Sequence, residues 1–537
     1  MAPPEAALQR APDPRRHWYA ALPPLLVILL YARSVHFDYV WDDWVLVPIH
    51  AYTSFDLVSI LTSPGNEVHY LPVRDLTLLL DTWLFGSWPG GFHLTNVIVF
   101  AIAGWLSYRV YLALFSAESR SEGGAAALAL VCALIFVAHP LQVEPVSFVS
   151  SRNGLLALTF VLASWLAYGR FLEGRGAGAY ALSLLFTAAA LLSKQSAVSL
   201  PLLLLLLHLY RRKDEGWLHA VRPLLPHFLL AAGLGMLHAG IARSVGVVGG
   251  EVTPLGLLER LPRAAFVSEF YVWKFLWPTE LSIEYPLGGY LGHRGLLAAS
   301  TLLMGAAFVL VVARGWRARS LSWLLAWSYL AGLLPVMNLL PTHPTVADRY
   351  AQLPLIALTP LLVAPCLTRL PVWPRYLTSA VLVIALSTAS FSQSSVWRND
   401  ETLFRHALSV APGASHALGN LGTMLWDDGR HEEALRVLAQ YHELDPADFR
   451  YHYALGLRAL EKGDLEQARV WLESASTRRG DFLFLVHMKL GELHLREDRR
   501  EEARRSFEQA LELARGRRQA REHQRVIERN LGLLGGG

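Results

Sequence analysis

The stretch LLSKQSAVSLPLLLLLLHLYRRK (191–213) places a run of apolar residues between a single lysine and a cluster of basic residues. Apolar runs of similar kind recur from about residue 18 to 391, whereas residues 392–537 are rich in Arg, Glu and His. The 537-residue chain is 53% hydrophobic and only 17% charged. About 20 consecutive apolar residues suffice to span a bilayer as a helix. The sequence therefore predicts an all-α protein in which a polytopic membrane domain precedes a soluble domain.

Eleven spanning helices are expected in the apolar part, and together they define a membrane domain at 18–391. They fall at 18–35, 92–115, 124–138, 153–171, 180–193, 196–210, 223–242, 294–313, 320–338, 350–368 and 375–391. One further stretch, RAAFVSEFYVWKFLWP (263–278), is rich in aromatic residues but carries Glu269 and Lys274. An amphipathic pattern of this kind favours an interfacial or re-entrant helix over a crossing.

Basic residues between the spans predict the orientation of the chain. The clusters are Arg10, Arg15 and Arg16; Arg211, Arg212 and Lys213; Arg314, Arg317 and Arg319; and Arg369 with Arg375. Because cytoplasmic loops carry an excess of Lys and Arg, these clusters are assigned to the cytoplasm. Eleven crossings then put the loop after the first span and the C-terminal domain on the opposite side. Residues 1–17 are expected to be cytoplasmic, and the first span, which lacks a small-residue cleavage site, to be an uncleaved signal anchor.

Three segments of the soluble part repeat one pattern of small and large residues. They are ALGNLGTMLWDDGRHEEALRVL (417–438), HYALGLRALEKGDLEQARVWL (452–472) and HMKLGELHLREDRREEARRSF (487–507). Gly422, Gly456 and Gly491 lie 34 and 35 residues apart, which is the period of tetratricopeptide helix pairs. The pattern therefore predicts a short tetratricopeptide array.

The array sets the expected organisation of the C-terminal part. A linker helix is predicted at 392–412, three repeats at 413–515, and a capping helix with a tail at 516–537. Stacked repeats of this type form concave surfaces that are used for binding. The array is therefore expected to hold an extended peptide, and a stability cap without a ligand is the alternative.

Ionisable residues gather at the span ends that face away from the predicted cytoplasmic side. The loop HFDYVWDDWVLVPIH (36–50) contains the adjacent acids Asp42 and Asp43, which alone would also suit a solvated loop. The others are Arg74, His139, Glu144, Arg152, Lys194, Asp348 and Arg349. A charge at the membrane edge is costly and faces a cavity or a partner, although an ion pair bracing two helix ends is the simpler explanation for each alone. Together the cations suit a lipid phosphate, and a carboxylate beside them suits a general base.

Several motifs follow one another in order over nearly the whole chain. They are the acid pair, GFHLTN (91–96), HPLQVEPVSFVSSR (139–152), WPTELSIEY (277–285), LPVMNLL (334–340), ADRYAQLP (347–354) and WRNDETLFRHAL (397–408). This pattern resembles the type C glycosyltransferases, and within them the O-mannosyltransferases that join a multispanning domain to tetratricopeptide repeats. Three positions depart from it, since Gly154 and Gln195 stand where the family pattern has acids and Asp348 stands in place of Glu.

The resemblance implies a mechanism. The donor would be a polyprenyl-phosphate sugar, such as mannose, and the acceptor a Ser or Thr hydroxyl of a polypeptide. Asp42 or Asp43, with Asp42 favoured, would take the hydroxyl proton as the oxygen attacks the anomeric carbon with inversion. The expected phosphate-binding residues are Arg74, Arg152, Lys194 and Arg349, and the expected supporting residues are His139, Glu144 and Asp348. No cofactor is required by the sequence, and dependence on a divalent metal is left open.

The expected partners are membrane lipid, a lipid-linked sugar and a polypeptide acceptor that the repeats would hold. Nucleic acid is not expected, because the basic residues lie in separate loops instead of one stripe. No Gly-rich nucleotide loop in a strand–helix context is present, which argues against a nucleotide-sugar donor. A membrane-anchored tetratricopeptide scaffold and a lipid or glycan transporter are the alternatives without transferase activity.

Composition bears on the compartment. The chain is heavy in Ala, Leu and Arg and poor in Lys and Asn, which is typical of a GC-rich bacterial genome. We therefore expect an inner-membrane protein with its active site and repeats in the periplasm, and the endoplasmic reticulum membrane is the alternative. Cys132 and Cys366 both lie in apolar segments, so a disulfide framework is not expected.

Overall fold

A computed structural model provides the structure of the chain. It describes residues 15–51, 60, 70–118, 122–244, 257–285, 305–306, 308–310, 312–315, 317–339, 345–515 and 520–535. Within these ranges every regular element is a helix, and the β structure amounts to an isolated bridge between Asp448 and Arg479. The predicted all-α class is confirmed.

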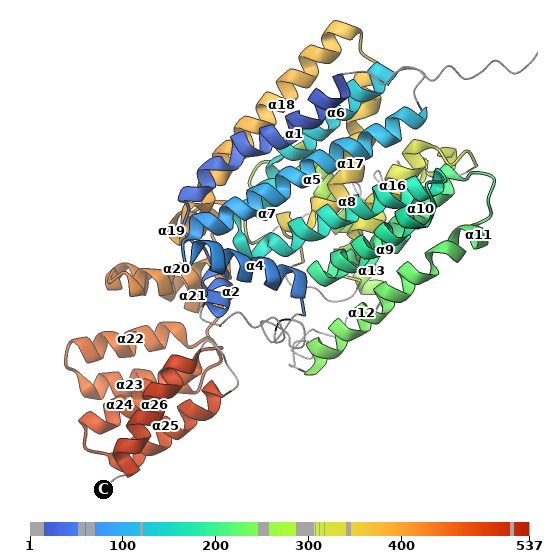
Figure 1. The fold of residues 1–537 in the computed structure, drawn as a ribbon. Coiled ribbons are helices and arrows are strands. Elements are labelled where there is room, and N and C mark those ends of the chain that lie inside the picture. The colour runs from blue at the N-terminus through green and yellow to red at the C-terminus, as the bar shows by residue number, and fades with distance from the viewer. Residues whose placement is uncertain are drawn as a thin grey trace, which may run out of the picture. The chain divides into compact units, whose positions relative to one another are not determined.

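The chain divides into two compact units, each with its own packing (Figure 1). The membrane unit comprises Met1–Ile283 and Leu287–Arg398. The repeat unit comprises Asn399–Gly537 together with the short segment Glu284–Pro286. The two units are described separately below.

The described helices of the membrane unit follow the predicted spans closely. They are α1 (Arg15–Tyr31), α2 (Asp43–Ala51), α4 (Pro72–Phe85), α5 (Pro89–Glu118), α6 (Glu122–Ala138), α7 (Val143–Ser147), α8 (Arg152–Leu172), α9 (Gly176–Ser193), α10 (Leu200–Arg211), α11 (Trp217–Val221), α12 (Leu225–Ser244), α13 (Leu257–Leu276), α16 (Leu321–Leu333), α17 (Gln352–Thr368) and α18 (Val372–Ser394). Short 3₁₀ turns that matter below are η2 (Pro140–Gln142), η3 (Val149–Ser151), η4 (Gln195–Ser199), η6 (Leu334–Val336) and η7 (Asp348–Tyr350).

Several of these helices have the length and apolar composition of membrane spans. The six in the described residues are Trp18–His36, Pro89–Glu118, Val149–Leu172, Gly176–Ser193, Trp217–Ile241 and Val372–Arg398. A seventh is formed if Gly123–Ala138 and Pro140–Ser147, bent by 57°, count as one broken span. The chain is thus an integral membrane protein by its helices, while a total of eleven crossings stays a prediction. The span predicted at 294–313 lies largely outside the described residues.

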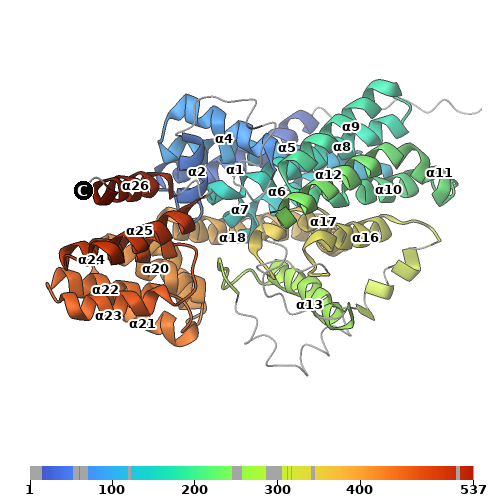
Figure 2. The same cartoon turned by 90° about the horizontal axis from the view of Figure 1, so that it is seen from below.

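Helix α5 occupies the middle of the bundle and contacts α1, α6 and α8 (Figure 1). It buries residues on all sides and has no distinct polar face, as expected of a helix surrounded by others or by lipid. A second group brings α8, α9, α10 and α12 side by side, with α16 and α17 packed against each other nearby (Figure 2). The candidate site described below lies where this second group meets the short turns η4 and η7.

Two helices of the unit are amphipathic and do not have the character of spans. Helix α4 buries Leu78 and Leu79 and exposes Trp83 and Leu84. Helix α13 covers most of the segment for which an interfacial or re-entrant helix was predicted, and it is not among the spanning candidates of the described residues. Exposed Trp and Leu on a helix with a polar face suit the interface between headgroups and lipid tails.

The repeat unit is built from helix pairs that stack in order of sequence. Its helices are α19 (Asp400–Val410), α20 (Ser415–Asp427), α21 (His431–Leu444), α22 (Arg450–Glu461), α23 (Leu465–Ser476), α24 (Leu483–Arg496), α25 (Arg500–Ala514) and α26 (Arg521–Gly535). The pairs α20–α21, α22–α23 and α24–α25 pack within themselves, and α26 packs on α25. The three predicted repeats correspond to these three pairs.

One contact recurs in each pair and explains the glycines. A Cβ added at Gly422 would lie 2.6 Å from the Leu438 side chain, and one at Gly456 would lie 2.7 Å from Leu472. In the third pair, Gly491 stands in the same relation to Phe507. The large partner follows its glycine at the same spacing each time. Only glycine therefore lets the first helix of a pair come this close to the second.

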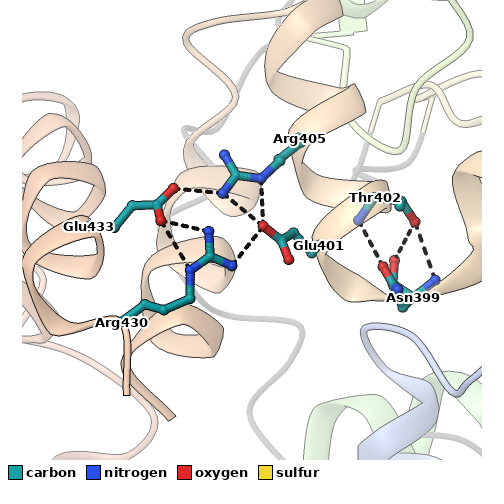
Figure 3. A network of polar contacts seen from close by, with 6 residues as sticks. All are labelled: Asn399, Glu401, Thr402, Arg405, Arg430 and Glu433. Carbon is teal, nitrogen blue, oxygen red and sulfur yellow. Dashed lines mark hydrogen bonds and ion pairs between the residues drawn. The ribbon is translucent and has the colours of Figure 1, made fainter. Parts of the chain in front are cut away.

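The start of helix α19 is capped by two side chains, those of Asn399 and Thr402. Asn399 Oδ1 accepts a hydrogen bond from the Thr402 backbone N–H at 3.0 Å, and Thr402 Oγ1 accepts one from the Asn399 N–H at 3.3 Å (Figure 3). This reciprocal capping box satisfies two backbone donors that a helix start would leave unpaired. The boundary between the two units falls at this residue.

A ring of four charged side chains joins α19 to the start of α21. Arg405 Nη2 lies 2.6 Å from Glu433, and Arg430 Nη1 lies 2.8 Å from Glu401 (Figure 3). Arg405 also reaches Glu401, and Arg430 also reaches Glu433, so each cation touches both acids. The side chains are 28–44% exposed, and water therefore weakens each pair.

Candidate active site

The loop after α1 holds two adjacent acids in different surroundings. Trp41 has a left-handed backbone, with φ at 52°, and α2 begins two residues later at Asp43. Asp43 is fully buried, whereas Asp42 is exposed. A sharp turn thus places neighbouring carboxylates in positions where they cannot perform the same task.

The carboxylate of Asp43 ties this loop to η3. It accepts hydrogen bonds from the backbone N–H of Val149 at 3.3 Å and of Ser150 at 2.7 Å, and from the Ser150 hydroxyl at 2.6 Å. The N–H of Val40 is a fourth donor, at 3.4 Å. Burial raises the pKa of Asp43 to about 7, while the hydrogen bonds act against this rise. Asp43 is therefore occupied in holding the loop, and Asp42 is the accessible acid.

Arg349 of η7 lies between a carboxylate and two aromatic rings. Its guanidinium pairs with Glu144 of α7, and Glu144 Oε2 also accepts the Arg349 backbone N–H at 3.1 Å. The guanidinium carbon is 5.8 Å from the ring centroid of Trp41 and 5.4 Å from that of Tyr350. Burial lowers the pKa of Arg349, but Glu144, Tyr350 and Asp42 together raise it above its ordinary value. Arg349 therefore stays charged and interacts electrostatically with the exposed Asp42.

Lys194 lies at the point where α9 ends. Its backbone is extended, and Nζ lies 5.9 Å from the ring centroid of Tyr350. Burial and, to a smaller extent, the nearby Arg349 lower the pKa of Lys194 to about 8, and Glu144 opposes this change. Among the described residues, the structure records no ion pair between Lys194 and a carboxylate. Two cations thus meet around one tyrosine, and Arg349 is ion-paired with Glu144.

Lys194 and Arg349 line one pocket. The rest of the lining is Gly154, Ala157, Leu158, Val161, Ser196, Ala197, Gly332, Val336, Tyr350, Gln352 and Leu353, from α8, η4, α16, η6, η7 and α17. The pocket thus combines two cations with an apolar wall. This combination suits an anion that is attached to a hydrocarbon chain.

Two of the predicted phosphate-binding residues are buried elsewhere, each with partners of its own. Arg152 is fully buried and forms an ion pair with Asp81 at 2.5 Å. It also donates to Asn96 Oδ1 and to the Phe92 carbonyl, each at 2.8 Å. Arg74 is 3% exposed and forms an ion pair with Asp75, the next residue in the chain, at 2.6 Å. Both guanidinium groups are thus neutralised within the protein, and neither lines the pocket.

Asp81 is a residue that the sequence analysis did not identify. It lies on the buried face of α4, where Leu78 is also buried, and it accepts a hydrogen bond from Thr95 at 2.7 Å. An acid at a buried position of an amphipathic helix is a signal that the sequence contained. What the sequence did not contain is that this acid meets Arg152 of α8.

The remaining predicted residues have contacts of their own. His139 is buried, its Nδ1 accepts the Leu141 N–H at 3.2 Å, its Nε2 lies 3.0 Å from the Phe275 carbonyl, and its ring stacks on that of Phe275. Burial lowers the pKa of His139 to about 4, so the ring is neutral near pH 7 and caps η2. Asp348 is 4% exposed, and its charge opposes the fall that burial causes in the pKa of Lys274. Of the predicted set, Asp42, Glu144, Lys194 and Arg349 are the ones brought to the pocket or beside it.

The described residues contain no group of three or more His, Cys, Asp or Glu side chains placed to hold a metal ion. Metal dependence is therefore a matter for experiment.

Comparison with known proteins supports the resemblance noted in the motifs. The tetratricopeptide repeat family profile matches residues 486–521, which include most of α24 and all of α25. The human protein O-mannosyl-transferase TMTC4 is 25% identical over 483 residues, covering 78% of this chain and 65% of its own length. The predicted similarity to transmembrane and tetratricopeptide-repeat O-mannosyltransferases is confirmed.

Two other relatives show the same extent of similarity. Human protein O-mannosyl-transferase TMTC1 is 24% identical and covers 76% of this chain and 53% of its own length. The Drosophila melanogaster protein O-mannosyl-transferase Tmtc1 is 23% identical over 528 residues, with 76% of this chain and 59% of its own length covered. The chain thus spans just under two thirds of the human TMTC4 protein and less of the others.

Proposed function

We propose that this protein is a membrane glycosyltransferase that moves a sugar, mannose by analogy with its relatives, from a polyprenyl-phosphate carrier to a Ser or Thr hydroxyl of a polypeptide. The observation that carries the proposal is the apolar pocket lined by Lys194 and Arg349, with the exposed Asp42 acting on Arg349. An apolar wall with two cations fits a phosphate on a lipid, and an accessible carboxylate beside it fits a base.

The two cations would bind the donor phosphate and stabilise it as it leaves. Arg349 presents a planar set of donors that can grip two phosphate oxygens, and Lys194 adds a point charge. Negative charge on the bridging oxygen grows as its bond to the anomeric carbon breaks, so fixed cations favour the transition state over the ground state. The apolar residues of α8 and α17 would hold the first part of the lipid chain.

Asp42 would be the general base. The acceptor hydroxyl gives its proton to Asp42 while its oxygen forms a bond to the anomeric carbon. The bond from that carbon to the phosphate oxygen breaks, the electron pair leaves with the phosphate, and the configuration inverts. Asp43 is unsuited to this step because four donors already occupy its buried carboxylate.

The repeat unit would hold the acceptor polypeptide, as tetratricopeptide arrays bind extended segments in other proteins. The active site and the repeats would lie outside the cytoplasm. The loops that carry the basic clusters favour the cytoplasmic side, and the site and the repeats lie at the other ends of the spans. A bacterial inner membrane with these parts in the periplasm is the location that the composition favours, and the endoplasmic reticulum membrane is the alternative.

The proposal is tested with the full chain in lipid nanodiscs, using radiolabelled polyprenyl-phosphate mannose and a Ser/Thr-containing peptide. Asp42→Asn keeps the size of the side chain but cannot take a proton, so transfer should fall by roughly 10²–10⁴-fold. Asp38→Asn, an exposed acid of the same loop, is the matched control and should transfer normally. Wild-type transfer rates in Asp42→Asn would contradict the role of the base, and no transfer by the wild type would favour a scaffold or a transporter.

A further inference from the structure

One side chain of the pocket has an unused hydrogen-bonding group. Gln352, the first residue of α17, is 4% exposed and lines the same pocket as Lys194 and Arg349. Its side-chain Nε2 is buried and has no hydrogen-bond partner within the described part of the chain. A buried amide donor without an acceptor is unfavourable, and such groups are uncommon in native proteins. An acceptor that belongs to a ligand would resolve this.

The position opposite Gln352 is a glycine, which leaves the carboxamide its space. A Cβ at Gly154 of α8 would lie 2.4 Å from Gln352 Oε1 and 3.1 Å from Lys194 Nζ. The carboxamide oxygen and the ammonium group therefore converge on one point beside α8. The amide oxygen therefore lies on the side of α8, while the N–H₂ end has no acceptor among the described residues.

The cations beside it cannot supply the acceptor. An ammonium and a guanidinium only donate hydrogen bonds, so neither can satisfy a third donor. A phosphate offers oxygens that only accept, and several donors can bind it at once. The same anion that would neutralise Lys194 and Arg349 would therefore also satisfy Gln352.

We propose that Gln352 is a further donor-binding residue, whose carboxamide N–H donates to an oxygen of the lipid phosphate that Lys194 and Arg349 hold. The inference rests on the proposed function, because it needs that phosphate in the pocket. Gly154 acts as a positioning residue in this arrangement, since any side chain there would displace the carboxamide.

The test measures binding of a short polyprenyl monophosphate to the full chain in nanodiscs, with the corresponding polyprenol and inorganic phosphate as comparisons. Gln352→Met keeps the length and burial of the side chain and removes the donor, so affinity for the lipid phosphate should fall about tenfold. Gln352→Glu keeps the shape and adds a like charge, so its loss should be larger. Neither variant should change the weak binding of the polyprenol, which lacks the phosphate.

The variant Gly154→Ala tests the same inference independently. The added methyl group meets the far end of the Gln352 side chain, which can rotate away, so the fold should survive while affinity for the lipid phosphate falls. In a Gln352→Ala background the methyl group no longer meets the carboxamide and only the Lys194 ammonium stays close, at 3.1 Å, so Gly154→Ala should then cause a smaller further loss. A purely structural role for Gln352 would instead lower the melting temperature and leave the ratio of lipid-phosphate to polyprenol affinity unchanged.

The outcomes separate this inference from the proposed function. Binding of the lipid phosphate by the wild type that depends on Lys194 and Arg349, but is unchanged in Gln352→Met and Gln352→Glu, overturns the role of Gln352 alone. Failure of the wild type to prefer the lipid phosphate over the polyprenol overturns both. Equal competition by inorganic phosphate would mean that the apolar wall plays no part, and it would also count against both.

Discussion

Arg152 and Arg349 are both arginines beside turns at the edge of the membrane unit, yet their surroundings differ completely. Arg152 is fully buried, and Asp81, Asn96 and the Phe92 carbonyl engage its guanidinium. Arg349 is 17% exposed, is bound by one acid, Glu144, and lines a pocket. A charge enclosed with its own counter-charge serves the fold, whereas a charge that borders empty space is available to a ligand.

The largest effect is expected when the enclosed cation is removed. Arg152→Ala leaves the carboxylate of Asp81 buried without its counter-charge, and breaking a buried pair in this way costs about 3–5 kcal/mol of stability. Thermal unfolding of the protein in detergent micelles should show a large drop in melting temperature. Arg170→Ala, at an exposed position of the same helix α8, is the control and should change little. Normal stability but lost donor binding in Arg152→Ala would reverse the comparison.

Removing the pocket cation should affect ligand binding more than folding. Arg349→Ala should weaken polyprenyl-phosphate binding by at least about tenfold, because a hydrogen bond to a charged group is lost. The variant also leaves the carboxylate of Glu144 buried without its counter-charge, which costs stability of its own. Adding Glu144→Gln to Arg349→Ala should restore much of the stability without restoring affinity. If the double variant recovers binding as well, Arg349 acts only through the position of Glu144.

The dependence of binding on pH tests the role of Lys194, the second cation of the pocket. Lys194 has its pKa lowered from 10.5 to about 8, so it loses its proton as the pH rises through about 8. Affinity for the lipid phosphate should therefore fall between about pH 7 and pH 9, when the cation is lost. Lys194→Arg stays charged throughout this range and should bind with a flatter pH profile. A wild-type affinity that is constant up to pH 9 would show that Lys194 does not face the phosphate.

The smallest effects are expected in the exposed charge ring of the repeat unit. Arg405 is 44% exposed, and Arg405→Ala should lower the free energy of unfolding by about 0.2–1 kcal/mol, since water screens such pairs. Asn399→Ala, which removes the cap of the same helix, should cost about 0.5–2 kcal/mol. The two melting temperatures are compared under high and low salt, and the Arg405 effect alone should shrink with salt. An Arg405→Ala effect as large as that of Arg152→Ala would mean that exposure is not what separates these arginines.

The fold was readable from the sequence because its signals are local. Apolar runs of spanning length predicted the helices of the membrane unit, and the glycines at 422, 456 and 491 predicted three helix pairs whose contacts with Leu438, Leu472 and Phe507 recur in the structure. Each of these signals lies within one or two adjacent helices. The count of crossings depends on each helix's placement in the bilayer, which is not a local property, and it stays a prediction.

The site was only partly readable because charge partners meet across helices that are distant in sequence. The sequence showed that Arg152 and Arg349 are cations near span ends. It did not show that Asp81 of α4 forms an ion pair with Arg152, or that Arg349 lines the pocket. Gln352 was passed over because a single neutral amide carries no pattern. Its proposed role follows from its unpartnered Nε2 and from the missing side chain at Gly154, a departure that the sequence did reveal.

The tie between Asp43 and η3 has a consequence for the order in which the protein is made. The loop that presents Asp42 is held by Val149 and Ser150, which are added to the chain 106 and 107 residues after Asp43. A growing chain that has inserted only its first helices therefore has the acid but not its support. The loop takes its final shape once η3 and the start of α8 have left the ribosome. Under the proposed function, a half-made protein would therefore be unable to act on donor or acceptor before the helices that form the pocket are in place.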